Sequence, residues 1–272
     1  MITLLKYEFI RNAIFAGILV SFICGIVGVF VILKRVVFIS GGIAHSSFGG
    51  IGLGYLLGIN PTLTTLLFSI ISALSIGFIS KRTKVHEDTA IGILWAIGMA
   101  LGIVFVSLSK GFAPDLFGYL FGNILAVTSS DILLMLILSI AIILIIVLFF
   151  KEFLIISFDD EFGRVVGVPT EFLYLLFLCL IALTVVILMK VVGIILVIAF
   201  LTIPAATSRF LTNDLKKMML ISVLLGTLSV IIGLVLSYNF DIASGATIVL
   251  VSGGMFLFAY LFKTLLHRTT VS

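Results

Sequence analysis

The stretch FISGGIAHSSFGGIGLGYLLG, residues 38–58, combines seven glycines and one histidine in a run without a charged residue. It is long enough to cross a bilayer as a helix, because a helix rises about 1.5 Å per residue and the hydrocarbon core is about 30 Å thick. Its small residues, taken four apart, form one row on a helix face: Gly42, Ser46, Gly50, Gly54 and Gly58. Such rows allow close backbone approach between helices in lipid. We therefore expect a transmembrane helix packed inside a bundle.

The composition extends this interpretation to the whole chain. Of 272 residues, 62% are hydrophobic and 10% are charged, and the mean hydropathy is +1.43. A soluble domain carries about 25% charged residues. The net charge of +4 is modest, and we attribute it to topology and lipid headgroups rather than to nucleic acid. The sequence predicts an all-α polytopic membrane protein with a single transmembrane domain over residues 1–272.

Uncharged runs between charged clusters predict about nine transmembrane helices. They are expected at 13–33, 38–58, 62–80, 89–109, 131–150, 172–189, 191–208, 218–238 and 244–262. A tenth apolar piece, 116–126, is too short to cross and is expected to be re-entrant or interfacial. Residues 1–12 are expected to form an N-terminal interfacial segment. Pro204 is expected to kink its helix, because proline removes a backbone hydrogen bond.

The distribution of lysine and arginine predicts the orientation of these helices. If the loop with Lys34 and Arg35 is cytoplasmic and the sides alternate from there, twelve of the sixteen Lys and Arg residues are cytoplasmic and four are outside. This asymmetry agrees with the positive-inside rule. We therefore expect a multi-pass protein of the inner (plasma) membrane, with its N-terminus outside and its C-terminus in the cytoplasm.

The longest polar connection is the cytoplasmic segment KEFLIISFDDEFGRVVGVPTE, residues 151–171. It carries an N-cap, an acidic first turn, a glycine stop and a following proline, in order Asp159 or Asp160, Glu161, Gly167 and Pro169. These signals predict a short helix. The residues alone leave two interpretations for it: a docking element for a partner, or a solvated loop helix without one.

His45 stands out on the row adjacent to the small residues, between Gly41 and Gly49. Residues 36–80 contain no Asp, Glu, Lys or Arg, so His45 is the one group there that titrates near neutral pH. Gly41 and Gly49 flank it along the helix, so we expect its ring to face open space. Ionisable residues inside membranes are costly and commonly face a cavity, and neutral imidazole binds zinc and other first-row metals well. The alternative is a histidine that ties two helices together through a hydrogen bond to a hydroxyl or carbonyl group.

Enzyme signatures are missing from the sequence. His86-Glu87 is not followed by the second histidine of an HExxH metal site, and no GxxxxGK[ST] phosphate-binding loop occurs. The chain is therefore expected to be non-catalytic. A secondary carrier or channel, working without an ATPase, is the alternative from another class. Coupling to protons or sodium would call for carboxylates within the membrane, and the clear spans contain none.

Six blocks of the sequence resemble, in the same order, the permease subunits of the bacterial zinc/manganese/iron ABC importer family. The blocks are GVFVILKRVVFISGGIAHSSFGGIGLGYLLG (28–58), EDTAIGILWAIGMALGIVFVSLS (87–109), DLFGYLFGNILAVTSSDI (115–132), FDDEFGRVVGVPTEF (158–172), VVGIILVIAFLTIPAATSRFLTNDL (191–215) and DIASGATIVLVSGGMFLF (241–258). Together they cover nearly the whole chain.

The resemblance implies a permease that works as a homodimer with two cytoplasmic ATPase subunits and an extracytoplasmic metal-binding protein. Its fold would be similar to that of vitamin B12-type importer permeases without their first helix. It would move divalent zinc, manganese or iron into the cytoplasm, with ATP hydrolysed on the partner and no permanently bound cofactor. The terminal residues 1–12 would then face the binding protein.

The resemblance also implies roles for particular residues. The segment DDEFGRVVG looks like the coupling helix that sits in a cleft of the ATPase, and its matching positions are Asp160, Glu161, Gly163 and Gly167. His45 matches the histidine of the family's G-D-x-x-S-H block, which is proposed to line the metal path. Many relatives carry aspartate four residues before it, where this chain has Gly41. A second His45 across the dimer axis is our hypothesis for the missing ligand.

Overall fold

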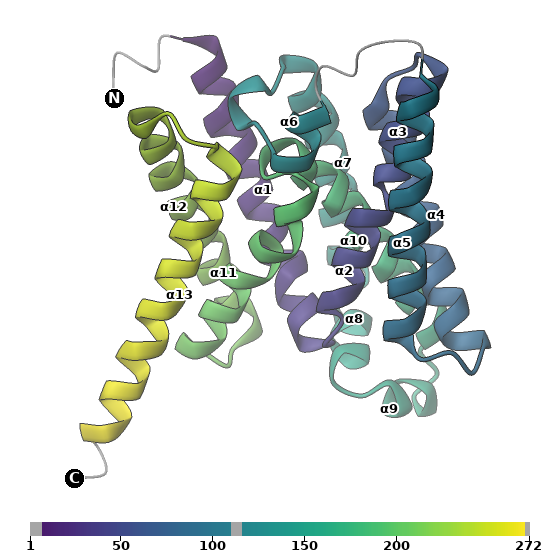
Figure 1. Ribbon diagram of the computed structural model, residues 1–272. Helices are drawn as coiled ribbons and strands as arrows, with labels where there is room; N and C mark the ends of the chain where they lie inside the picture. The colour runs from purple at the N-terminus through teal and green to yellow at the C-terminus, as the bar shows by residue number, and fades with distance from the viewer. Residues whose placement is uncertain (1–6, 110–115, 270–272) are drawn as a thin grey trace.

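Helices form all the regular secondary structure in the residues that the computed structural model describes, 7–109 and 116–269 (Figure 1). Eight helical segments in this part of the chain are long and apolar enough to cross a membrane. They are α1 (Glu8–Leu33), α4 (Pro61–Arg82), α5 (Glu87–Leu108), α7 (Ser129–Leu148), α10 (Thr170–Val191), η3 with α11 (Ile194–Leu196 and Val197–Leu211), α12 (Leu215–Phe240) and α13 (Ser244–Thr269). Each matches one of the predicted spans, which confirms the all-helical membrane fold.

The remaining predicted helix, 38–58, is broken, and the expectation of one continuous helix was wrong. The chain forms α2 (Val37–Ser46) and α3 (Phe48–Leu57), which meet at Ser47. The hydroxyl groups of Ser46 and Ser47 donate to the carbonyls of Ile43 (3.1 Å) and Ala44 (2.6 Å), one turn back. Such back-bonding of serine competes with the regular helical ladder and bends helices.

The helices at the middle of the bundle are α1 and α10. Within their most apolar windows, 67% of the residues of α1 and 72% of those of α10 are buried, compared with 17% for α5. Phe30 of α1 packs against Phe150, Phe153 and Phe177, with ring centroids 6.1–6.3 Å apart. The core of the protein therefore forms around α1 and α10, and α5 presents much of its surface outward.

The two ends of the bundle carry different short elements. At one end lie α8 (Phe150–Phe158) and α9 (Asp160–Val165), and α13 ends on the same side of the bundle (Figure 1). At the other end lie α6 (Leu116–Phe121), η2 (Ile124–Ala126) and the start of α1. Helix α1 begins at Glu8, so residues 8–12 of the expected interfacial segment belong to a spanning helix, and residues 1–6 lie outside the described residues.

Helix α8 corrects the expectation that residues 151–171 form a polar connection. Its apolar residues Phe153 and Ile156 are buried against the core. Charged residues at 151–152 and 159–160 flank this apolar stretch in the sequence and made the whole segment read as a loop. The part of the segment that projects from the bundle is therefore shorter, and consists of α9 and the residues that follow it.

The row of small residues lies against neighbouring helices for most of its length. A Cβ atom added to Gly50 would lie 2.6 Å from Cα of Thr65, and one added to Gly54 would lie 2.6 Å from Cα of Pro61, both on α4. A Cβ at Gly42 would lie 2.5 Å from Cγ2 of Ile91 on α5. Gly58 departs from the expected packing role, because a Cβ there would meet no atom within 4 Å. Its φ of +66° shows instead a left-handed turn that ends α3.

We expect Gly98→Ala to destabilise the protein, while Gly92→Ala on the same helix leaves it nearly unchanged. A Cβ at Gly98 would collide with the backbone of Ser46 on α2, and backbone atoms cannot move aside locally; a Cβ at Gly92 meets nothing within 4 Å. Overpacking of this kind costs on the order of 1–3 kcal/mol. Thermal unfolding of the two purified variants in detergent measures the difference, and equal melting temperatures would contradict the tight α2–α5 contact.

Candidate functional site

His45 lies in α2, two residues before the break at Ser47, and its side chain is half-buried. Within the described part of the chain, no hydrogen bond or ion pair engages its ring nitrogens; its one ring contact is with Trp95. The interpretation that His45 ties two helices together through a hydrogen bond therefore finds no support in the structure. The imidazole keeps its nitrogen atoms available for a ligand.

Trp95 of α5 stacks on the imidazole of His45. The ring centroids are 3.9 Å apart and the planes differ by 6°. Trp95 was not among the predicted site residues, and the ring of His45 was expected to face open space. A signal was present: Ile91, Trp95, Gly98 and Gly102 recur at helical spacing, so the single tryptophan of the chain shares a face with two glycines.

The positions that flank His45 are filled from other helices. Where many relatives of the resembled family carry aspartate, this chain has Gly41, and a Cβ there would collide with the side chain of Ile198 on α11. Trp95 is the next neighbour, with Cζ3 4.0 Å from that point. At Gly49, a Cβ would lie 2.6 Å from the ring of Phe68. The structure therefore brings no carboxylate beside His45, and the described residues contain no group of three or more His, Cys, Asp or Glu that could hold a metal ion.

A polar hollow opens between the first turns of α2 and α5, at the end of the bundle that carries α9. Its lining residues are Arg35, Val36, Phe38, Ile39, His86, Glu87, Asp88 and Ile91. Ile91 lies one helical turn before Trp95 on α5, and Phe38 lies two turns before His45 on α2. The seam between α2 and α5 therefore joins the hollow to the stacked pair.

Helix α9 is capped at both ends by its own sequence, as predicted. Of the two expected N-caps it is Asp159 that serves: its carboxylate accepts hydrogen bonds from the backbone N–H groups of Glu161 and Phe162, both at 2.9 Å. At the other end Gly167 adopts φ +83°, and the N–H of Val168 donates to the carbonyl of Gly163 at 2.9 Å. This is the Schellman arrangement of a helix end.

Lys34, at the end of α1, fixes α9 to the bundle. Its ammonium donates to the carbonyl of Ile156 in α8 (2.7 Å) and pairs with the carboxylate of Asp160 in α9 (3.0 Å). The Lys34 side chain is 7% exposed and that of Asp160 is 40% exposed. Burial lowers the pKa of Lys34, and the Asp160 carboxylate opposes that shift. Of the predicted coupling residues, Asp160 is thus engaged within the chain, whereas Glu161 is exposed.

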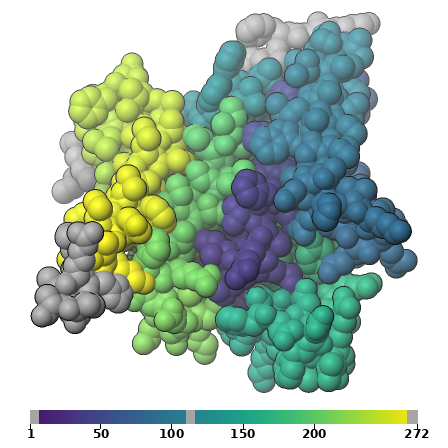
Figure 2. Space-filling model, turned by 60° about the horizontal axis from the view of Figure 1, so that its bottom comes forward, coloured from purple at the N-terminus to yellow at the C-terminus, as the bar shows by residue number. Residues whose placement is uncertain are grey.

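The outer face of α9 is apolar and exposed. Phe162 is 54% exposed, Val165 85% and Val166 50%. Gly163 faces the other way and is buried, and a Cβ there would lie 3.0 Å from Cγ2 of Thr170. Figure 2 views this end of the molecule, where the residues of α8 and α9 project in teal-green beside the purple surface of the α1–α2 junction. We call Phe162, Val165 and Val166 the α9 apolar face. A surface of this kind commonly marks an interaction site.

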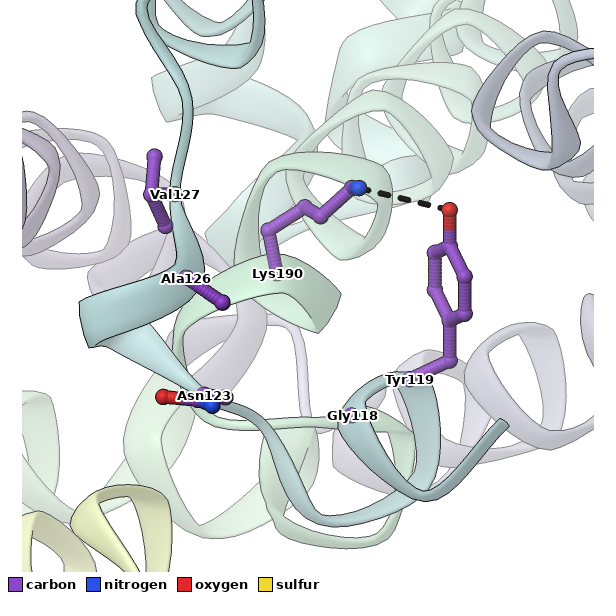
Figure 3. A pocket seen from close by; sticks show the side chains of 6 residues that line it. All are labelled: Gly118, Tyr119, Asn123, Ala126, Val127 and Lys190. Atoms are coloured by element: carbon purple, nitrogen blue, oxygen red, sulfur yellow. Dashed lines mark hydrogen bonds between the residues drawn. The ribbon is translucent and has the colours of Figure 1, made fainter. Parts of the chain in front are cut away.

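A charged cluster closes the opposite end of the bundle. Lys190 of α10 donates to the hydroxyl of Tyr119 in α6 at 3.3 Å (Figure 3). It also pairs with the carboxylate of Asp131 in α7 at 3.3 Å. Tyr119 is 5% exposed, and Tyr119 and Lys190 line a small hollow together with Asn123 and Val127. Three helices are therefore joined at this point.

The expected re-entrant or interfacial piece, 116–126, is two short helices held against the end of α10. Gly122 and Gly193 adopt φ +76° and +80°, and a Cβ on either would collide with the backbone of the other's segment. Only glycine meets both conditions, because L side chains rarely adopt this conformation and no space is left for one. Pro204, the expected kink, lies buried inside α11.

A family model described as the ABC 3 transport family matches residues 6–263. An uncharacterized membrane protein of Synechocystis sp. is 44% identical over 97% of this chain and 94% of its own. The manganese transport system membrane protein MntC of Listeria monocytogenes is 40% identical over 95% of this chain and 92% of its own. Among solved structures, PsaBC from Streptococcus pneumoniae, in complex with Fab, matches with a TM-score of 0.86 at 36% identity, over 96% of this chain and 95% of that one.

Proposed function

Because this chain belongs to the ABC 3 transport family, we propose that it is the membrane-spanning permease of an ABC importer that carries a divalent metal ion into the cytoplasm. Manganese is the first candidate cargo among manganese, zinc and iron, because a relative 40% identical over 95% of the chain is named for manganese transport. His45 lines the path of the ion, and the chain itself hydrolyses no ATP.

The observation that carries the ATP-driven part of this proposal is the α9 apolar face. Three large apolar side chains are exposed on a helix that is capped at both ends and held to the bundle by Lys34. A rigid element with an exposed apolar surface suits docking into a groove of a partner. We propose that this partner is a cytoplasmic ATPase subunit, bound once by each protomer of a permease homodimer.

Orientation follows from the same assignment. If α9 faces the cytoplasm, the C-terminus does so too, and the start of α1 lies outside, as the lysine and arginine count predicts. The extracytoplasmic end would then consist of the start of α1, α6 and η2, where a metal-binding protein would deliver the ion. The membrane would be the plasma membrane.

The secondary carrier remains the second candidate, and the positions of the carboxylates argue against it. In the described residues, the acidic side chains within or beside spanning helices stand in first turns or at caps: Glu8, Glu87, Asp88, Asp131, Glu171, Asp214 and Asp241. Carboxylates that couple transport to protons or sodium lie within the membrane.

The proposal is tested by reconstituting the chain in liposomes with its ATPase and its binding protein, the latter loaded with Mn²⁺ or Zn²⁺. We expect the loaded binding protein to stimulate ATP hydrolysis. We also expect the metal to cross to the opposite side of the membrane when ATP is supplied to the ATPase, and to stay on the side of the binding protein when ATP is absent. The ion that stimulates hydrolysis more strongly is the preferred cargo. Metal flux through the chain alone, without an ATPase or ATP, would establish the carrier instead.

A further inference from the structure

The His45–Trp95 pair has little freedom to rearrange while α2 and α5 remain in contact. A Cβ at Gly98, three residues beyond Trp95, would collide with the backbone of Ser46, the residue that follows His45. A Cβ at Gly42 would lie 2.5 Å from Ile91, one turn before Trp95. Close contacts between α2 and α5 therefore lie on both sides of the stack: one with the backbone of Ser46 and one with the side chain of Ile91. The indole covers one face of the imidazole, while the ring nitrogens, which lie in the plane of the ring, keep no partner among the described residues.

The surroundings of the pair leave His45 as a single ligand from this protomer. Ile198 occupies the space beside Gly41 where a neighbouring carboxylate would stand. The described part of the chain brings no three His, Cys, Asp or Glu side chains together elsewhere. A single imidazole binds a divalent ion weakly, and a transport path needs sites that an ion can leave. What a single ligand lacks is the orientation that a set of ligands would impose on one another.

We propose that Trp95 is the positioning residue of the metal path: its indole holds the imidazole of His45 in a fixed plane and so presents a pre-oriented nitrogen ligand to a passing divalent cation. The proposal rests on the proposed function and adds how its site is organised. Orientation by packing reduces the conformational freedom that a flexible ligand loses on binding. Stacked aromatic rings stabilise one another beyond the area that they bury. Loss of the stack is therefore expected to weaken engagement of the ion roughly three- to tenfold.

Trp95 is the only tryptophan of the chain, so its fluorescence reports on this site directly. The probe is Mn²⁺ itself, added to the purified full-length chain in detergent. Mn²⁺ is paramagnetic and quenches an indole at short range, whereas Zn²⁺, with a filled d shell, does not quench in this way. We expect Mn²⁺ to quench the emission with a saturable curve, and Zn²⁺ to compete with it. His45→Phe, which keeps an aromatic ring against the indole, is expected to abolish the saturable part.

Transport by the reconstituted complex separates positioning from simple packing. Trp95→Leu fills space without a stacking ring and is expected to lower Mn²⁺ uptake three- to tenfold, while ATPase stimulation by the loaded binding protein stays near the wild-type level. Trp95→Phe retains a ring and is expected to recover most of the uptake. A purely structural tryptophan predicts instead that both variants lose thermal stability, uptake and stimulation together.

Two results would overturn the proposal. One is Mn²⁺ quenching that is absent, non-saturable or unchanged in His45→Phe; the other is wild-type uptake by Trp95→Leu. Failure of the proposed function is distinguishable, because the wild-type complex would then show no ATP-dependent uptake while the quenching titration still reports on the pair. If Trp95→Leu does not assemble, the titration of wild type against His45→Phe decides.

Discussion

Val165→Asp is expected to abolish binding of the ATPase subunits and, with it, ATP-dependent metal uptake. Val165 is 85% exposed at the tip of α9, next to Phe162 on the same apolar face. A carboxylate placed in an apolar contact must lose its hydration without gaining a partner, which costs several kcal/mol. A loss of about 3 kcal/mol corresponds to roughly a hundredfold weaker association. Co-purification of the ATPase with the tagged chain measures the loss.

The control for this prediction is Val85→Asp. Val85 is also an exposed valine at the same end of the bundle, 39% exposed, but it lies in the loop between α4 and α5. The chemical change is identical, so a general effect of added negative charge would appear in both variants. Neither side chain is part of the core, and both proteins are expected to keep the wild-type melting temperature. Retention of the ATPase by Val165→Asp would refute the assignment of α9 as the docking element.

The predicted coupling residues divide into two groups in the structure. Gly163 and Gly167 shape α9 itself, one by being buried and the other by its left-handed φ. Asp160 binds Lys34 within the chain, whereas Glu161 is exposed and is free to meet a partner. Substitution of Glu161 is therefore expected to act on the contact with the ATPase, and substitution of Asp160 on the connection between α9 and the bundle.

Local signals in the sequence predicted the local structure well. The caps of α9 depend on residues within nine positions of one another, so Asp159, Glu161 and Gly167 could be interpreted without knowledge of the fold. The long spans could be predicted for a similar reason, since the hydropathy of a segment depends on its composition alone and the helical rise is the same in every α-helix. The break at Ser47 escaped prediction because apolar patterning does not register hydroxyl groups that bond one turn back, as those of Ser46 and Ser47 do.

Contacts between distant parts of the chain could not be predicted in the same way. Trp95 and His45 belong to different helices, and their stacking depends on the close approach that Gly98 allows. Lys34 and Asp160 are 126 residues apart, and each has an ordinary local explanation as a charge at a helix end. Such pairs follow from how the helices pack. A single sequence shows which helix faces can pack closely, because their residues are small, but it does not show which helices pack against one another.

The second large effect is expected from Lys34→Met, which should uncouple ATP hydrolysis from transport without preventing ATPase binding. The substitution leaves the carbonyl of Ile156 without its donor and the carboxylate of Asp160 without its cation. Unsatisfied groups of this kind cost about 1–3 kcal/mol each when buried, and less for Asp160, which water can reach. Helix α9 would keep its apolar face and its caps but lose its tie to α1.

Lys34 also contacts α10, which is in turn hydrogen-bonded to α5. Its ammonium is 5.6 Å from the ring centroid of Tyr174 in α10, and the Tyr174 hydroxyl donates to the carboxylate of Glu87 at 3.3 Å. Glu87 is the first residue of α5, the helix that carries Trp95. A displacement of α9 that moves Lys34 would therefore act on Tyr174, which is hydrogen-bonded to the first residue of α5. Loosening Lys34 should weaken this mechanical link, so ATP would be hydrolysed with little metal uptake.

A double-mutant cycle with Asp160→Asn isolates the contribution of the ion pair. If Lys34 acts through Asp160, the double variant should couple no worse than Lys34→Met alone, and the interaction free energy between the two positions should differ clearly from zero. Lys84→Met, which removes an exposed lysine from the α4–α5 loop at the same end, is the matched control and should couple normally. The ratio of metal transported to ATP hydrolysed measures coupling in all five proteins: wild type, the two single variants, the double variant and the control. Equal ratios for Lys34→Met and Lys84→Met would contradict this prediction. The Lys34–Asp160 ion pair would then contribute no more to coupling than an exposed lysine does, and α9 would transmit its movement by another route.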